Sequence, residues 1–108
     1  MGTAAFTYQL KPGVNPADYE RWIVDFDYPH VALIPSVVSQ KIYKIGGAIM
    51  GGAKPYDYLE IIEYTTLEAF LNDLQTNPNA QAIAAQVGQY VNFQTNAWGT
   101  FIPPGVSH

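Results

Sequence analysis

Two side chains near residue 30 have the types and spacing needed for acid–base chemistry. His30 is one of two histidines, and the other, His108, is the last residue of the sequence. Imidazole titrates near neutral pH, so a histidine beside a carboxylate can act as a general acid or base. Asp27 lies three residues before His30, which places both side chains on one face if a helix continues through them. They are candidate catalytic residues, although the same pair could instead cap the C-terminus of a helix.

A second candidate is a glutamate in the middle of an apolar, tyrosine-rich segment. Glu60 lies between Tyr58 and Ile62, which alternate with it on one side of a predicted strand. Burying a carboxylate there is unfavourable unless it is paired or protonated, and a pocket carboxylate with a raised pKa is a candidate base. If this side of the strand is solvated, Glu60 is only a surface charge.

Aromatic side chains form a third group, which could bind a flat aromatic ligand. Their rings supply apolar surface, and their hydroxyl or indole N–H groups can orient a ligand. The alternative is that they form the core and a subunit interface. Trp98 falls on the opposite alternation from Phe93, so we do not expect all of them to face one cavity. The candidate substrate-binding residues are Tyr8, Trp22, Tyr28, Tyr43, Tyr58 and Glu60.

The composition argues against several other kinds of site. The net charge is −4 and the five basic residues are scattered, which does not favour nucleic-acid binding. There is no cysteine, and one internal histidine with dispersed acids does not provide the three ligands of a catalytic zinc. The glycine pairs at 46–47 and 51–52 join two predicted strands and do not open a helix, as a phosphate-binding loop would. We therefore expect neither a metal nor a cofactor.

The chain carries no targeting or membrane signal that we can identify. Residues 1–10 lack a basic segment followed by an apolar one, so no signal peptide is expected. No stretch approaches the roughly 20 apolar residues of a membrane span. We expect a cytoplasmic protein that does not associate with membranes.

The elements that position these residues follow from hydrophobic periodicity and turn residues. Asn15 and Pro16 predict a helix N-terminus, and the apolar stripe from Tyr19 to Phe26 carries the helix at least to Asp27. Pro29 disfavours helical geometry at Tyr28, which predicts a break or kink. Strands are predicted at 4–10, 36–45, 56–64 and 91–101. A helix over 67–77 is expected to be capped by Thr65 or Thr66 and to stop near Asn77-Pro78, and a further helix is expected over 80–90.

This order predicts an α+β fold, a ferredoxin-like β-α-β-β-α-β domain over residues 1–108. Its four-stranded antiparallel sheet would carry all helices on one face. The other face would expose more apolar surface than a monomer usually tolerates, and only 13% of residues are charged against about 25% in typical domains. Both points favour a homodimer.

Three segments resemble a known family. They are Tyr19-Glu20-Arg21-Trp22, the run from Asp25 to His30, and the run from Ile34 to Tyr43. The first-half pattern is similar to the REDY-like family of the dimeric α/β-barrel superfamily. The family's name spells Arg-Glu-Asp-Tyr, and Asp25-Phe26-Asp27-Tyr28 stands there in this chain, so the second half is kept.

The resemblance implies a small, cofactor-independent protein of natural-product biosynthesis, in prodiginine-type or bisindole-like pathways. We expect it to bind or act on a small aromatic intermediate, with His30 as the acid or base and Asp27 assisting. The alternative is a non-catalytic dimer that binds a small molecule or supports another enzyme.

Overall fold

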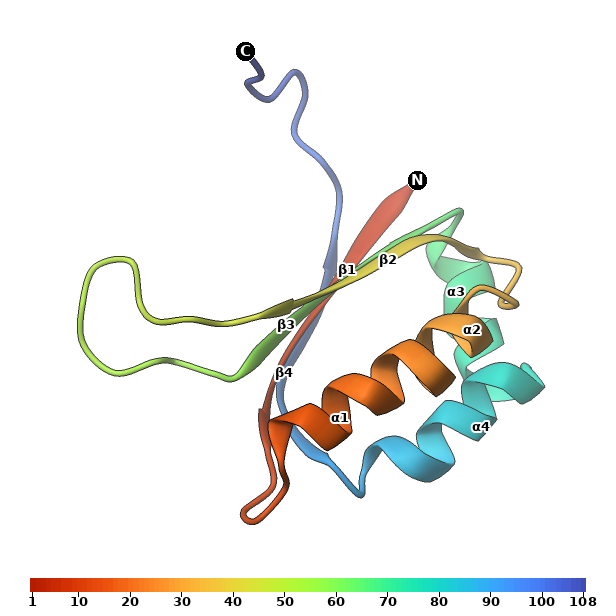
Figure 1. The fold of residues 1–108 in the computed structure, drawn as a ribbon. Helices are drawn as coiled ribbons and strands as arrows, with labels where there is room; N and C mark the ends of the chain where they lie inside the picture. The colour runs from red at the N-terminus through yellow and green to blue at the C-terminus, as the bar shows by residue number, and fades with distance from the viewer.

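A four-stranded antiparallel sheet forms one layer of the computed structural model, which describes residues 1–108. Its strands are β1 (Gly2–Leu10), β2 (Val37–Lys44), β3 (Tyr58–Tyr64) and β4 (Val91–Gly99), in the order β2-β3-β1-β4. All helices lie on one face of the sheet (Figure 1). The predicted ferredoxin-like α+β fold is confirmed.

The first helical segment runs without a break from residue 16 to residue 31. It consists of α1 (Pro16–Trp22), a π-helical turn η1 (Ile23–Asp27) and α2 (Tyr28–Val31). Asn15 caps it as predicted, accepting a 2.9 Å hydrogen bond from the Ala17 amide.

Of the break or kink predicted at Tyr28, the break is wrong. Tyr28 is helical, with φ −56° and ψ −47°, and its amide bonds to the Ile23 carbonyl five residues earlier. Pro29 has no amide hydrogen, and its ring would collide with a carbonyl in a regular α-helix. The wider π turn just before it accommodates the ring and keeps the helix continuous.

The second helical segment is divided in two, as the sequence predicts. Thr66 caps α3 (Leu67–Thr76), since its hydroxyl accepts from the Ala69 amide at 3.2 Å. Asn77 separates this helix from α4 (Pro78–Val87) and accepts from the Asn79 amide at 2.9 Å. The predicted stop at Asn77-Pro78 is confirmed.

The core lies between the layer of helices and the sheet. The apolar stripe predicted for the first helix is confirmed, because Tyr19, Trp22 and Ile23 are all buried. The largest buried cluster is formed by Tyr8, Tyr19, Trp22, Ile23, Tyr58 and Val91. This cluster packs the first helix against strands β1, β3 and β4.

A β-bulge in β4 changes which of its residues face the helices. Thr7 pairs with Thr95, but Tyr8 pairs with Phe93, so Gln94 is the extra residue. Trp98 pairs with Ala4, which faces the helices as Tyr8 does. Phe93 and Trp98 therefore share the helix-covered face, and the prediction that they lie on opposite faces is wrong.

The other face of the sheet is uncovered in one copy of the chain (Figure 1). Strand alternation places Ala5, Thr7, Leu59 and Ile61 on it, together with Tyr43, which is 48% exposed. The long β2–β3 connection and the C-terminal segment extend away from the helices on this side (Figure 1). Among the helices, none has both the length and the apolar character needed to cross a membrane.

Candidate functional site

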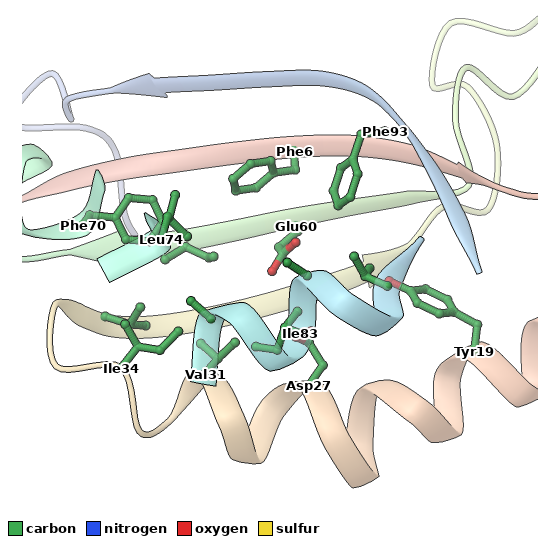
Figure 2. Close-up of a pocket in the computed structure, with 15 residues that line it drawn as sticks. Phe6, Tyr19, Asp27, Val31, Ile34, Glu60, Phe70, Leu74, Ile83 and Phe93 are labelled. Carbon is green, nitrogen blue, oxygen red and sulfur yellow. The ribbon is translucent and has the colours of Figure 1, made fainter. Parts of the chain in front are cut away.

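A cavity of about 240 Å³ lies between the helix-covered face of the sheet and the helices. Thirteen of its fifteen lining residues are hydrophobic. Figure 2 shows their side chains converging from the sheet above and the helices below. They are Phe6, Tyr19, Val31, Ile34, Val37, Ile62, Phe70, Leu74, Ala80, Ile83, Ala84, Val87 and Phe93.

The two remaining lining residues are both acids. Asp27 comes from the π turn and is 5% exposed, whereas Glu60 comes from the middle of β3. Glu60 is half-buried because it points into the cavity, where Figure 2 shows it facing the helix that carries Asp27. An apolar cavity with two carboxyl groups on its walls is the principal candidate site.

Gln40 joins the two carboxyl groups. Its side-chain amide nitrogen donates to Glu60 Oε2 at 2.6 Å and to Asp27 Oδ2 at 3.1 Å. Gln40 lies on β2, whose register places Ile42 opposite Glu60 and Gln40 opposite Ile62. Both amide hydrogens are used in this bridge, so the amide orients two carboxyl groups from different elements.

Both carboxyl groups bind protons more tightly than usual. Burial raises the pKa of Asp27 to about 6, against the opposing effects of the Gln40 hydrogen bond and of nearby His30. Burial and the negative charge of Asp27 raise the pKa of Glu60 to about 7, although the Gln40 hydrogen bond acts in the opposite direction. The pair thus exchanges protons near neutral pH, the range in which a general acid or base is effective.

Two buried tyrosines extend the polar part of the site into the core. Tyr19 lines the cavity, and its hydroxyl donates to the Tyr8 hydroxyl at 2.8 Å. Burial, with the nearby charge of Glu60, raises the pKa of both phenols well above the usual range. Both stay protonated, and they can only donate or accept hydrogen bonds.

His30 is not among the residues that line the cavity. Its Nδ1 lies 2.7 Å from the Phe26 carbonyl oxygen, one turn earlier, and its ring stacks on Phe26 with centroids 4.0 Å apart. This is the contact expected of an imidazole near a helix C-terminus. The structure does not bring His30 to the two acids as a third cavity group.

The other predicted binding residues do not line the cavity. Tyr8 and Tyr58 are buried core residues, and the Tyr58 hydroxyl donates to Glu20 at 2.6 Å. The Trp22 indole donates to Gln86 at 2.9 Å, which links α1 to α4. Tyr28 accepts from the Ile42 amide at 3.2 Å, and Tyr43 is on the uncovered sheet face. Of the predicted residues, only Asp27 and Glu60 line the cavity.

Sequence reasoning missed Gln40 and the site role of Tyr19. A signal for Gln40 exists, because it is a polar residue that alternates with Ile42 on the inward side of a strand. Tyr19 was placed correctly on the buried stripe, but nothing in the sequence shows that it reaches the cavity. No group of three or more His, Asp or Glu side chains converges as a metal site would require.

The sequence profile described as REDY-like protein HapK matches residues 3–102. The chain belongs to the REDY-like family. A sequence comparison with curated proteins gives no match. In this REDY-like protein, Asp27 and Tyr28 match the last two residues of the Arg-Glu-Asp-Tyr motif. Asp27 lines the cavity, and the Tyr28 hydroxyl accepts a hydrogen bond from β2.

Solved structures share the fold of this REDY-like chain. HapK from Hahella chejuensis superposes with a TM-score of 0.81 at 22% identity, covering 100% of this chain and 99% of that one. SnoaB from Streptomyces nogalater, described as a cofactor-independent oxygenase, gives 0.71 at 16% identity, covering 95% and 94%. A dimeric ferredoxin-like protein of unknown function from Thermobifida fusca gives 0.66 at 16%, covering 94% and 92%.

Proposed function

We propose that this protein binds a small, largely apolar aromatic molecule in the cavity and exchanges a proton with it through the Asp27–Glu60 pair. One observation carries the proposal. The only two ionisable carboxyl groups that line the cavity lie on different elements, and a single amide, that of Gln40, orients both. Such a site suits a ring system that carries a hydrogen-bond donor, such as a pyrrole or indole N–H.

Proton transfer is the chemistry that these groups can perform without a cofactor. The ionised carboxylate of Glu60 takes a proton from one atom of the ligand, and the carboxylic acid so formed returns a proton to another atom. No electrons or further reactants are needed, so the step balances as an isomerisation. Between the two transfers the Gln40 hydrogen bond stabilises the ionised form of Glu60, and the negative charge of Asp27 favours the protonated form.

Membership of the REDY-like family supports a place in natural-product biosynthesis of the prodiginine or bisindole-like kind. The likeness to SnoaB, described as a cofactor-independent oxygenase, is in keeping with chemistry that needs no bound cofactor. The sequence-based assignment of the acid–base role to His30 stays a prediction. We favour Glu60 for that role because it faces the cavity and His30 does not.

Binding without catalysis is the second candidate. The two acids already accept hydrogen bonds from Gln40, so they are satisfied without a ligand. In that case the pair would orient a bound molecule and the protein would act as a carrier or accessory subunit. Turnover of a bound ligand distinguishes this role from the enzymatic one.

We also propose a homodimer formed through the uncovered sheet face. That face carries small and apolar side chains, including Ala5, Leu59 and Ile61, and no helix of the same chain covers them. The fold relative from Thermobifida fusca is described as dimeric, which supports the same assembly here. Pairing two such faces would remove this apolar surface from water.

Calorimetric titration with indole and with benzofuran tests the binding site. Benzofuran has nearly the same shape, but an oxygen replaces the N–H group. We expect indole to bind about tenfold more tightly than benzofuran at pH 8, where Glu60 is ionised, and the preference to shrink at pH 5. Glu60→Leu should abolish the preference, and His30→Ala should retain it. Equal affinities for the two ligands at both pH values would contradict the proposal.

A further inference from the structure

A second hollow adjoins the cavity at the end away from Tyr19. It is an open groove of about 490 Å³ between α3 and strands β1 and β4, and eight of its nine lining residues are hydrophobic. The groove shares three lining residues with the cavity, namely Phe6, Phe70 and Leu74. Figure 2 shows Phe70 and Leu74 at one end of the cavity, with the acids near its middle. The two hollows are thus consecutive parts of one apolar surface.

The outer groove exposes side chains that water would not normally contact. Trp98 is 63% exposed, Leu71 is 47% exposed and Leu74 is 43% exposed. The bulge at Gln94 is what turns Trp98 toward this groove, because without the extra residue it would face the other side of the sheet. A bulge that re-aims an aromatic side chain beside a cavity is a feature typical of binding sites.

We propose that the cavity and the groove together form one elongated site for a two-part aromatic ligand. The ring bearing the N–H group lies in the inner cavity beside Asp27 and Glu60, and a second, apolar ring system extends past Phe70 and Leu74 onto Trp98. This inference rests on the proposed function for its inner half. Its outer half rests on the continuity of the two hollows and on the exposed side chain of Trp98.

A short and a long probe separate the two halves of the site. Indole fills only the inner cavity, whereas diindolylmethane carries a second indole that would reach Trp98. The sequence has two tryptophans, Trp22 and Trp98, so NMR shows only two indole N–H signals. We expect diindolylmethane to shift the Trp98 signal and indole to leave it in place.

Substitutions in the full-length chain make the test quantitative. Trp98→Ala should weaken diindolylmethane binding by about tenfold and indole binding by less than about twofold. Leu71 lines the groove from α3, and Leu71→Gln should also weaken diindolylmethane binding more than indole binding. Phe101→Ala is the matched control, because Phe101 is 68% exposed but does not line the groove, and it should change neither affinity.

Failure of this inference differs from failure of the proposed function. If Trp98→Ala and Leu71→Gln leave diindolylmethane affinity unchanged, the outer groove is not a ligand site, as when a second copy or the C-terminal segment covers it in solution. If Glu60→Leu leaves both affinities unchanged while Trp98→Ala lowers one, the acid pair takes no part in binding. The second result overturns the proposed function and the inner half of the elongated site.

Discussion

Gln40 and Glu60 lie on neighbouring strands and are joined by a 2.6 Å hydrogen bond at the wall of an apolar cavity. The same amide nitrogen also reaches Asp27 on the first helical segment. Each carboxyl group therefore has a hydrogen-bond donor that offsets part of the free-energy cost of burying it. The stability of the fold and the protonation of the site are coupled through this one amide.

Replacing Gln40 with leucine should destabilise the protein and raise the pKa of both acids further. The substitution leaves two buried carboxyl groups without their donor, which costs about 1–3 kcal/mol when they are ionised. The loss of stability should be greater at pH 8 than at pH 5, because a hydrogen-bond donor stabilises a carboxylate more than a protonated carboxylic acid. Urea unfolding at the two pH values measures it. Gln75→Leu, at an exposed position of α3, is the control and should change stability little.

Replacing Glu60 with glutamine should remove much of the pH dependence of stability between about pH 4.5 and 7. The folded protein holds the Glu60 proton up to about pH 7, whereas the unfolded chain releases it near 4.5. The unfolded state therefore binds fewer protons in this window, and the wild type loses stability as the pH rises. Glutamine carries no charge, so the variant should be more stable than the wild type at pH 8, by on the order of 1–3 kcal/mol.

Thermal unfolding of Glu60→Gln from pH 4.5 to 8 checks this expectation. Asp27→Asn should show a smaller effect of the same sign, since burial raises the Asp27 pKa from 3.8 to about 6. Asp25→Asn is the control, because Asp25 is exposed on η1. Parallel pH profiles for Glu60→Gln and the wild type would show that Glu60 titrates in the ordinary range.

Replacing His30 with alanine should lower stability and leave ligand binding intact. The variant loses the contact between Nδ1 and the Phe26 carbonyl and the stacking on the Phe26 ring, which together contribute about 1 kcal/mol. Chemical unfolding and indole titration measure the two quantities separately. If His30→Ala retains its stability but loses proton exchange with a bound ligand, His30 is the acid or base and our assignment to Glu60 fails.

Placing a charge on the uncovered sheet face should separate the proposed dimer. Ile61→Lys would bring two lysines into a face-to-face interface, where their burial is strongly unfavourable. Light scattering at micromolar concentration should give a mass near twice 11.9 kDa for the wild type and near 11.9 kDa for the variant. Val24→Lys, on an exposed helical position, is the control and should keep the larger mass. A wild type of monomer mass would contradict the dimer directly.

Local sequence signals predicted the elements well. The cap at Asn15, the cap predicted at Thr65 or Thr66, the stop at Asn77-Pro78 and the alternation around Glu60 depend on neighbouring residues. The structure confirms them and selects Thr66 as the second cap. The two errors arose where the chain departs from regular periods. A π turn carries the helix past Pro29, and an extra residue at Gln94 reverses the alternation of β4.

The candidate site was predictable only in part, because its members come from three separate elements. Asp27 and Glu60 were identified by residue type and surroundings, but their meeting through Gln40 depends on the register between β2 and β3. His30 and Asp27 share a helix at the expected spacing, yet only the aspartate turns toward the cavity. Strand register and the rotation of a π turn are tertiary properties that residue spacing does not encode.

The most direct test of the central claim is an NMR titration of the carboxyl carbons of Asp27 and Glu60, with and without indole. We predict coupled titrations with midpoints near pH 6 and 7, and a shift of both signals when indole occupies the cavity. Glu60→Gln assigns the signals by removing one of them. Midpoints near pH 4 for both acids, with no response to indole, would contradict the proposal that this pair exchanges protons with a bound aromatic ligand.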